Sequence, residues 1–193
     1  MIKNTLADKH KDQVVSKVND DAFSDDDNKF MRRAIELAKI ADSHDEITVG
    51  AVVVCAGEIV GEGFNQSIMN NDPSAHAEMM AIRDAGKNLQ NYRLLGCTLY
   101  VTLEPCPMCA GLLVHSRIKR LVFASNDLKT GAAGSAFSLV KHEKHNHQVA
   151  VTAGLLADKC STMLSTFFKR RRAAKKTEKK AEKNVNNPRI NTI

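Results

Sequence analysis

The first regular pattern in the chain is a stripe of apolar residues at helical spacing. It begins just after an acidic cluster that ends at Asp27, and its positions recur every three or four residues. The stripe consists of Phe30, Met31, Ala34, Ile35, Leu37, Ala38 and Ala41. This spacing predicts a helix that buries one face in a core, with Asp27 or Asn28 as its N-cap.

Two runs rich in β-branched residues follow this helix, at residues 48–54 and 58–63. Ala56 and Gly57 separate the two runs, which predicts a β-hairpin. The first run contains consecutive valines, so we expect its strand to be buried on both faces. Asn65 follows the second strand as either a turn residue or a ligand contact, and the local sequence favours the turn.

The rest of the chain alternates between strand and helix patterns. We predict helices over residues 74–88, 106–116 and 155–168, and strands over residues 95–103, 121–124 and 149–152. The middle helix connects two strands, and such a crossover favours parallel pairing of those strands. The sequence therefore predicts an α/β protein with a mixed sheet flanked by helices. Residues 127–135 are rich in Gly and Ala, which predicts a flexible loop without chemistry of its own.

The strongest candidate chemistry lies where the strand at residues 95–103 ends. Cys106 and Cys109 are three residues apart, and Pro105 and Pro107 are suited to open a helix, so both thiols would share one face of its first turn. The positive end of a helix lowers a cysteine pKa, and the thiolate is the form that binds metal. Catalytic groups also gather at the carboxyl ends of strands in open α/β sheets.

His76 is the candidate for a third metal ligand. It follows Asp72-Pro73-Ser74, a typical helix start, so its imidazole would stand at the mouth of a second helix. Three protein ligands are typical of a catalytic zinc, which keeps one position for water, whereas a structural zinc has four. Glu78 offers a carboxylate that takes a proton from such a water. His-x-Glu followed by Pro-Cys-x-x-Cys is a known signature of zinc-dependent nucleobase deaminases.

Two other interpretations of the Cys-x-x-Cys motif are half of a zinc knuckle and a redox pair. The chain has no second Cys-x-x-Cys, a redox pair does not require His-x-Glu, and a knuckle needs no carboxylate. We expect the remaining cysteines to be buried free thiols: Cys55, Cys97 and Cys160. A second group of candidate ligands is irregularly spaced, which favours a surface loop over a metal cluster: His142, His145 and His147.

Composition narrows the class of protein. The chain has 193 residues, of which 43% are hydrophobic, enough for one compact domain with some residues left for tails. It has no apolar run of membrane-spanning length and no signal-peptide pattern, so we expect a cytoplasmic protein with no membrane partner and with reduced thiols. Without Trp and with only two Tyr, it has no aromatic-rich surface that indicates stacking on single-stranded nucleic acid.

The net charge of +6 is concentrated near the C-terminus. Residues 169–183 hold nine Lys or Arg against two Glu, and residues 1–168 carry a net charge of −2. We divide the chain into a polar, loosely ordered extension (1–24), a deaminase domain (25–172) and a basic tail (173–193). The tail is either a solvated helical extension or a phosphate-binding segment. Phe167 and Phe168 directly precede the basic run, and aromatic and arginine side chains together suit a nucleotide strand.

Taken together, these motifs resemble those of the bacterial tRNA-specific adenosine deaminases. The resemblance extends from about residue 30 to residue 172. The zinc motif is shared with cytidine, cytosine and guanine deaminases, whereas Asn91-Tyr92-Arg93-Leu94 and the Lys-Thr-Gly-Ala-Ala-Gly-Ser run at residues 129–135 narrow the resemblance to this family. It implies a three-layer α/β/α, cytidine deaminase-like fold with a central mixed five-stranded sheet, and a homodimer with one zinc ion per subunit.

The resemblance also implies a reaction and a site. The wobble adenosine in the anticodon stem-loop of an arginine tRNA with an ACG anticodon would become inosine, with Glu78 shuttling the proton of a zinc-activated water. His76, Cys106 and Cys109 would be the metal ligands. The residues that would contact the RNA are Asn65, Ala77, Pro105, Asp127, Phe168 and Arg171.

Two rival functions belong to other classes. A deaminase of free bases or nucleosides would share the zinc site but would need no basic groove, and turnover of free guanine or cytosine would identify it. A zinc-stabilised RNA-binding module would have no catalytic activity. Glu78 argues against such a module, because it has no use for a positioned general base.

Overall fold

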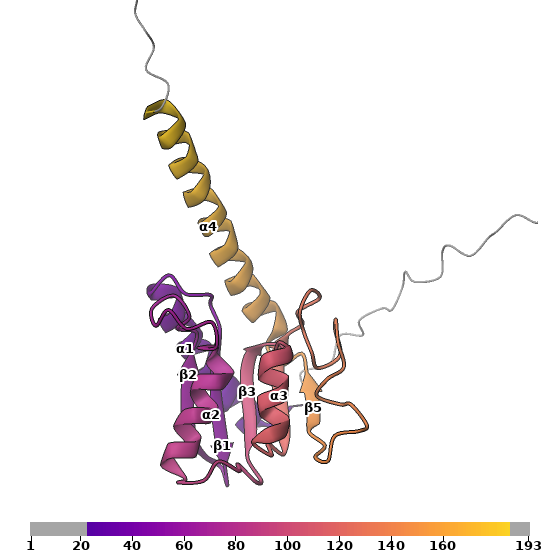
Figure 1. Cartoon of the computed structure of the whole chain (residues 1–193). Helices are drawn as coiled ribbons and strands as arrows, with labels where there is room; N and C mark the ends of the chain where they lie inside the picture. The colour runs from indigo at the N-terminus through magenta and orange to yellow at the C-terminus, as the bar shows by residue number, and fades with distance from the viewer. Residues whose placement is uncertain (1–22, 186–193) are drawn as a thin grey trace, which may run out of the picture.

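The computed structural model describes residues 23–185, with side chains described as far as residue 180. The described residues contain every predicted helix and strand (Figure 1), and only the last helix differs greatly in length from the prediction. In chain order the elements are α1 (Asp25–Ser43), β1 (Gly50–Cys55), β2 (Glu58–Phe64), α2 (Ala77–Asn88), β3 (Thr98–Leu103), α3 (Pro107–His115), β4 (Arg120–Ser125), β5 (Ala150–Ala153) and α4 (Ala157–Val185).

The five strands form one mixed sheet in the order β2-β1-β3-β4-β5. Strand β1 pairs antiparallel with β2 and β3, whereas β4 pairs parallel with β3 and β5. The parallel pair β3 and β4 is connected through α3, which confirms the predicted crossover. The hairpin between β1 and β2 turns at Ala56 and Gly57, whose φ angles of 50° and 83° supply the twist that a two-residue turn requires.

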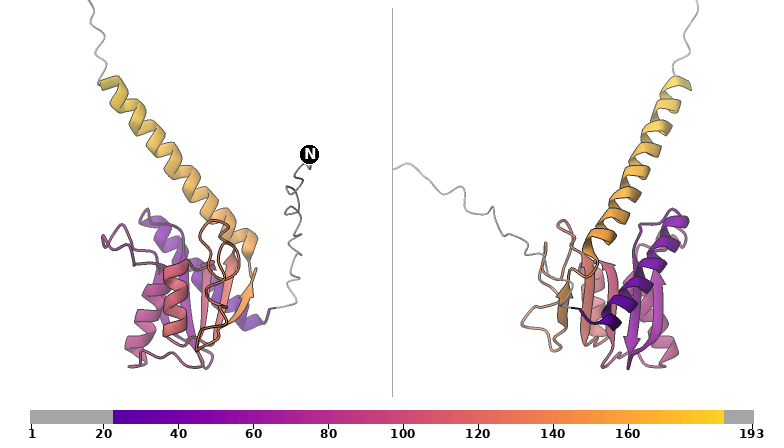
Figure 2. Two further views of the ribbon diagram at one scale, coloured as in Figure 1. Left: turned by 45° about the vertical axis from the view of Figure 1, so that its right-hand side comes forward. Right: turned by 180° about the vertical axis from the view of Figure 1, so that it is seen from behind.

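Helices cover both faces of the sheet (Figures 1 and 2). Helices α2 and α3 pack on one face, and α1 and the first part of α4 pack on the other. Val53 belongs to the core beneath α2 and α3, Val52 belongs to the core beneath α1, and both are fully buried. The burial of β1 on both faces and the three-layer α/β/α fold are therefore confirmed.

Two glycines of β2 allow α2 to approach the sheet closely. A Cβ atom at Gly63 would collide with the carbonyl oxygen of Ala77, and one at Gly61 would collide with that of Ala81. No other residue type fits at these positions without displacing the helix. The glycines thus set the depth of the α2 N-terminus, where two of the candidate site residues lie.

Helix α1 begins earlier than predicted, so the prediction that Asp27 or Asn28 is the N-cap is wrong. Ser24 is the N-cap, and its hydroxyl accepts a hydrogen bond from the Asp27 amide at 3.0 Å. The Asp27 side chain accepts one from the Ser24 amide at 3.4 Å, which completes a capping box. The signal was present in the sequence as a serine three residues before an acidic residue.

Helix α4 continues as one helix to Val185, through most of the segment predicted as a separate basic tail. It extends well beyond the edge of the sheet (Figures 1 and 2). None of the described helices, α4 included, is long and apolar enough to cross a membrane. The division of the chain at residues 24 and 172 stays a prediction, and the loose order expected of residues 1–22 concerns a segment outside the described residues.

Candidate active site

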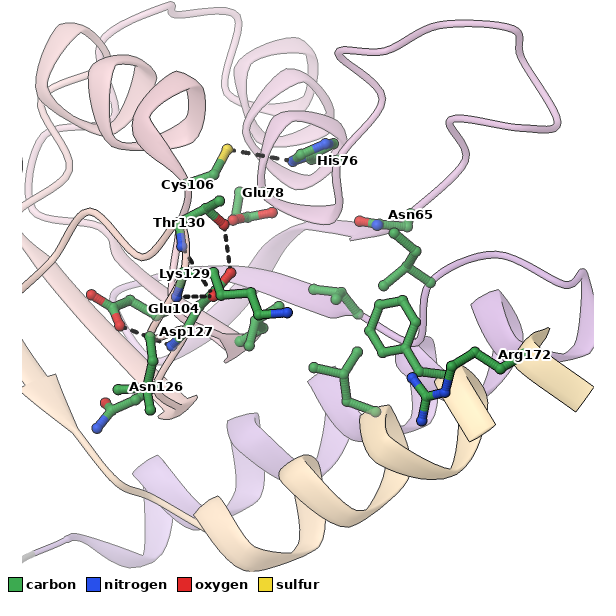
Figure 3. Close-up of a pocket in the computed structure, with 16 residues that line it drawn as sticks. Asn65, His76, Glu78, Glu104, Cys106, Asn126, Asp127, Lys129, Thr130 and Arg172 are labelled. Carbon is green, nitrogen blue, oxygen red and sulfur yellow. Dashed lines mark hydrogen bonds between the residues drawn. The ribbon is translucent and has the colours of Figure 1, made fainter. Parts of the chain in front are cut away.

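The three predicted ligand residues lie at two facing helix N-termini. His76 is the N-cap of α2, Cys106 is the N-cap of α3, and Cys109 lies in the first turn of α3. The Nδ1 atom of His76 is 3.6 Å from the Sγ atoms of both cysteines (Figure 3). All three donor atoms lie within 4.8 Å of one another. The structure therefore brings together residues that are thirty positions apart in the chain.

The geometry of this cluster fits a zinc ion. Zn–S bonds of about 2.3 Å and Zn–N bonds of about 2.0 Å at tetrahedral angles place sulfur and nitrogen ligands roughly 3.6 Å apart. The two nitrogen–sulfur distances here are both 3.6 Å. A nitrogen and two sulfurs are also the donor types that zinc prefers, and three ligands leave one position open for water.

Proton sharing within the cluster prepares one thiolate. The hydrogen bond with Cys109 has the largest effect on Cys106, and together with His76 it lowers the Cys106 pKa to about 4. The same hydrogen bond, with burial, raises the pKa of Cys109. The contact with Cys106 likewise raises the pKa of His76. A metal ion that binds here must displace protons from the other two groups, so its affinity falls as the pH is lowered.

The other predicted thiols and histidines lie outside this cluster. Cys97 and Cys160 are buried, as expected, whereas Cys55 is only half-buried because it ends β1 at the hairpin turn. His145 and His147 bond to backbone carbonyl oxygens of Leu139 and Ile118 through Nε2, at 2.8 and 2.7 Å. Within the described range, the trio of His76 and the two cysteines is the one group of side chains that could hold a metal. The surface-loop prediction for the histidines is therefore confirmed.

Glu78 lies in the first turn of α2, beside the cluster, and is not one of its ligands. Its side chain is buried, and this burial is the largest effect raising its carboxyl pKa above the usual value. The carboxylate borders the same cavity as His76 and Cys106 (Figure 3). A carboxyl group with a raised pKa exchanges a proton more readily near neutral pH than an exposed glutamate does.

The cavity above the cluster has a volume of about 560 Å³. His76, Glu78 and Cys106 form part of its wall, and other parts come from the loops after β2 and β4 and from α4. Three of the predicted RNA contacts line it: Asn65, Asp127 and Phe168. Arg172 also lines it (Figure 3), whereas the predicted Arg171 does not.

Asn65 does not occupy a turn, so the interpretation favoured from the local sequence is wrong. Its side chain is buried, and its Oδ1 accepts a hydrogen bond from the Ala77 amide at 2.8 Å. This bond ties the end of β2 to the first residue of α2, between His76 and Glu78. The side-chain amide of Asn65 faces the cavity (Figure 3), where its N–H groups can meet a polar ligand atom.

Ala77 and Pro105 do not line the cavity, although both were predicted as RNA contacts. The Ala77 amide is engaged by Asn65, and the Pro105 carbonyl accepts a hydrogen bond from the Ala132 amide at 2.8 Å. Each of these residues lies directly before or after a residue that does line it. Their backbones thus help to fix the positions of Glu78 and Cys106.

Glu104 is a site residue that sequence reasoning missed. It is buried between β3 and the Cys106 turn, and its carboxylate accepts three backbone hydrogen bonds from the loop at residues 127–135 (Figure 3). The donors are the amides of Ala133 at 2.9 Å, Ser135 at 3.0 Å and Asp127 at 3.1 Å. The loop predicted to be flexible is therefore anchored from below.

Asp127 organises the same loop from within. Its carboxylate accepts hydrogen bonds from the amides of Lys129 and Thr130 and from the Thr130 hydroxyl, at 2.9, 3.1 and 2.6 Å. Burial raises the Asp127 pKa, but these hydrogen bonds outweigh burial and hold it below its usual value. Asp127 therefore faces the cavity as a carboxylate near neutral pH.

Glu46 has a corresponding role on another wall and was also missed. It is almost completely buried, and its Oε1 accepts hydrogen bonds from the amides of Ile68 and Met69, at 2.7 and 2.8 Å. These amides belong to the loop that leads from Asn65 to His76. Two buried carboxylates thus hold two of the loops that surround the cavity.

Comparison with known proteins agrees with this site. Residues 24–125 match the cytidine and deoxycytidylate deaminase zinc-binding region. The fold, the match and the His-Cys-Cys cluster define the chain as a zinc-binding deaminase of the cytidine deaminase class. Over 157 residues it is 59% identical to the tRNA-specific adenosine deaminase of Haemophilus influenzae, an alignment covering 81% of this chain and 91% of that protein. The chain belongs to the tRNA-specific adenosine deaminase family.

Solved structures show the same fold. A structure from a study of A-to-I editing by tRNA:A34 deaminases at the wobble position is 37% identical, with a TM-score of 0.68, and covers 70% of this chain and 98% of its own. The guanine deaminase from Nitrosomonas europaea has a TM-score of 0.64 at 23% identity, covering 72% of this chain and 83% of that enzyme. The second likeness concerns the fold alone.

Proposed function

We propose that this protein deaminates adenosine to inosine at the wobble position of the anticodon loop of an arginine tRNA with an ACG anticodon. The observation that carries the proposal is one cavity that joins Glu78 and the His-Cys-Cys cluster to a rim containing Phe168 and Arg172. Relatives named tRNA-specific adenosine deaminase, at up to 59% identity, support tRNA as the substrate. The structure from the study of tRNA:A34 deaminases supports the wobble position.

In this proposal His76, Cys106 and Cys109 hold the zinc ion, whose bound form supplies a Lewis acid that activates water as a nucleophile. Glu78 takes the proton from the attacking water and delivers it to the purine ring. Water adds at C6 of the adenine, and ammonia leaves. Because Glu78 is buried and has a raised pKa, its carboxyl group can both accept and return a proton in one turnover.

The remaining wall of the cavity binds the nucleotide. Asn65 offers its amide to a polar atom of the base or ribose, and Asp127 accepts a hydrogen bond from a donor of a neighbouring nucleotide. Phe168 offers an aromatic ring on which a base stacks. Arg172 supplies a positive charge for a phosphate, and Arg171, half-buried and outside the cavity, stays a prediction as an RNA contact.

The homodimer is also part of the proposal. An apolar depression of about 450 Å³ lies between α2 and α3, where Tyr92 and Leu112 are among its lining residues. Tyr92 is 71% exposed and nearby Leu95 is 64% exposed, which is unusual for residues of this size. A second copy of the chain would cover this surface. Light scattering should then report a dimer, and Tyr92→Ser combined with Leu95→Ser should yield a monomer.

The rival function is deamination of a free base. The shared fold of the guanine deaminase from Nitrosomonas europaea keeps this candidate in view. The long, cationic α4 beside the cavity favours RNA, because a free base carries no phosphates for it to bind. A zinc-stabilised module without catalysis is disfavoured by Glu78, since a buried carboxylate beside the ligand cluster contributes nothing to such a fold. The cytoplasmic location expected from the sequence stays a prediction.

The test is inosine formation in an RNA hairpin that carries an ACG anticodon loop. Free adenosine, guanine and cytosine serve as parallel substrates, and zinc is measured on the same sample. Inosine at the wobble position alone is the expected result. Turnover of a free base without activity on the hairpin would replace the RNA enzyme by a nucleobase deaminase.

A further inference from the structure

Helix α4 leaves the cavity in a fixed direction. Phe167 is buried against the body of the protein, and the Arg170 guanidinium binds Asp42 at 2.9 Å and Asp45 at 3.5 Å, at the C-terminal end of α1. The guanidinium carbon of Arg170 also lies 5.5 Å from the centroid of the Phe167 ring. These contacts join α4 to α1 just before the helix extends away from the sheet (Figure 1). The part of α4 beyond Arg170 is therefore held by its base.

A stripe of five cations runs along this projecting part. We define the α4 stripe as Arg172, Lys175, Lys176, Lys179 and Lys180, which together line one shallow groove on the surface. At 100° per residue the five positions fall within about 140° around the helix axis, and Glu178 lies on the opposite side. At 1.5 Å per residue the stripe is about 12 Å long. Helical geometry thus gathers the positive charge on one face.

The stripe begins at the substrate cavity. Arg172 lines both the cavity and the groove of the stripe, so the two surfaces are continuous. None of the five cations forms an ion pair with a carboxylate among the side chains described, in contrast to Arg170. Their charge is therefore available to a ligand that extends from the cavity along α4.

We propose that the α4 stripe binds the phosphates of the paired stem next to the anticodon loop, an inference that rests on the proposed function. Duplex nucleic acid is densely charged, and in duplex DNA about 12 Å of axis carries roughly seven phosphates. The described residues after Phe168 include no aromatic side chain, which unpaired bases would need for stacking. They also include no large apolar residue of the kind that inserts into a membrane surface. Paired RNA read through its backbone is the ligand that fits.

The test compares two variants of equal charge. The stripe variant carries Lys175→Gln, Lys176→Gln, Lys179→Gln and Lys180→Gln and keeps Arg172, because Arg172 belongs to the cavity. Gln and Lys have similar helix propensities, so α4 should remain helical, which circular dichroism checks. The control variant carries the same change at four exposed lysines outside the stripe: Lys39, Lys119, Lys141 and Lys144. Both variants lower the net charge from +6 to +2.

Binding is measured at several salt concentrations on two RNAs. One is a hairpin whose loop already carries inosine, so that no turnover occurs, and the other is the same loop sequence as a linear strand. The stripe variant should bind the hairpin about tenfold or more weakly at low salt, with a salt slope smaller by up to about 0.9 per lost phosphate contact. Its affinity for the linear strand should match that of the control variant.

Two outcomes would overturn the proposal. Equal losses for the hairpin and the linear strand would show that the stripe does not read the stem, and equal losses in the stripe and control variants would show that only net charge matters. Deamination of the adenosine-containing hairpin by the wild-type protein is scored separately. Failure of the proposed function would appear there, whereas failure of the stripe proposal would appear in the binding data.

Discussion

The Oε1 atom of Glu104 lies 2.9 Å from the amide nitrogen of Ala133, and this contact joins the metal-binding turn to the loop that carries Asp127. Glu104 is two residues before Cys106 in the chain. One buried carboxylate therefore couples the position of a metal ligand to that of a proposed substrate contact. Gly131 is part of the same arrangement, because a Cβ atom at Gly131 would collide with the Glu104 carboxyl group.

Replacing this carboxylate should loosen the loop and spare the metal cluster. In Glu104→Gln an amide NH2 would replace one acceptor oxygen and would face a backbone N–H, and an unsatisfied buried donor costs about 1–3 kcal/mol. We expect a free energy of unfolding lower by that amount, a KM for the RNA hairpin raised roughly tenfold, and an unchanged zinc content. Ser135→Ala keeps the backbone donor to Glu104 and should behave like the wild type. An unchanged KM in Glu104→Gln would show that the anchor does not position substrate.

Glu78 should be needed for the reaction and not for metal binding. Glu78→Gln preserves the shape of the side chain but cannot take a proton, and general acid–base groups contribute about 10²–10⁴ in rate. We expect kcat to fall by roughly this factor while zinc content stays near one ion per chain. Single-turnover assays and metal analysis on the same preparation measure both quantities. If zinc and the fold were lost together, the role assigned to Glu78 would be wrong.

Loss of a thiolate ligand should instead weaken metal binding. Ser is a much poorer zinc ligand than Cys, so Cys106→Ser should release zinc to a chelator at a lower concentration than the wild type does. The matched control is Cys55→Ser, which alters a half-buried thiol outside the cluster. Two hydrophobic cores of the sheet do not involve Cys106, so far-UV circular dichroism should change little when zinc is removed. Equal chelator sensitivity in both variants would contradict the ligand assignment.

Much of the fold could be predicted because its signals are local. The consecutive valines of β1 and the proline-flanked cysteines before α3 each identify an element from a few neighbouring residues. Helix α1 was placed correctly from its apolar stripe, but its start was missed because the acidic cluster hid the serine cap. The length of α4 could not be decided, because a charged helix without an apolar face has no periodic pattern to read.

The site was predictable where its residues form a motif and not where they act at a distance. Glu46 and Glu104 bind amides more than twenty residues away, and no spacing rule connects a carboxylate to such partners. Arg172 was within reach of sequence reasoning. Leu164, Phe168 and Arg172 are spaced by four residues, so they share one face of α4 and all line the cavity. Once Phe168 is placed at the site, Arg172 follows from the helical repeat.

A buried ion pair far from the cavity should control acid stability. Asp27 is buried in α1, where it accepts hydrogen bonds from the Tyr100 hydroxyl and from Arg120 Nη1, both at 2.7 Å. Burial alone would raise the pKa of Asp27, but Arg120 and Tyr100 outweigh it, and the pKa lies below the usual value of 3.8. The unfolded chain therefore takes up a proton at Asp27 at a higher pH than the folded chain does. The stabilisation is complete above about pH 4 and is lost as the pH falls through the folded-state pKa.

Asp27→Asn should remove this contribution. It leaves the partly exposed Arg120 without its carboxylate, and at pH 7 we expect a loss of about 1–3 kcal/mol, below the range for fully buried pairs because solvent reaches Arg120. The difference from the wild type should shrink as the pH falls below about 4. Urea unfolding at a series of pH values measures it, and Asp26→Asn, at the exposed neighbouring position, is the control. A constant difference between pH 7 and pH 3 would show that the Asp27 carboxylate does not stabilise the fold through its charge.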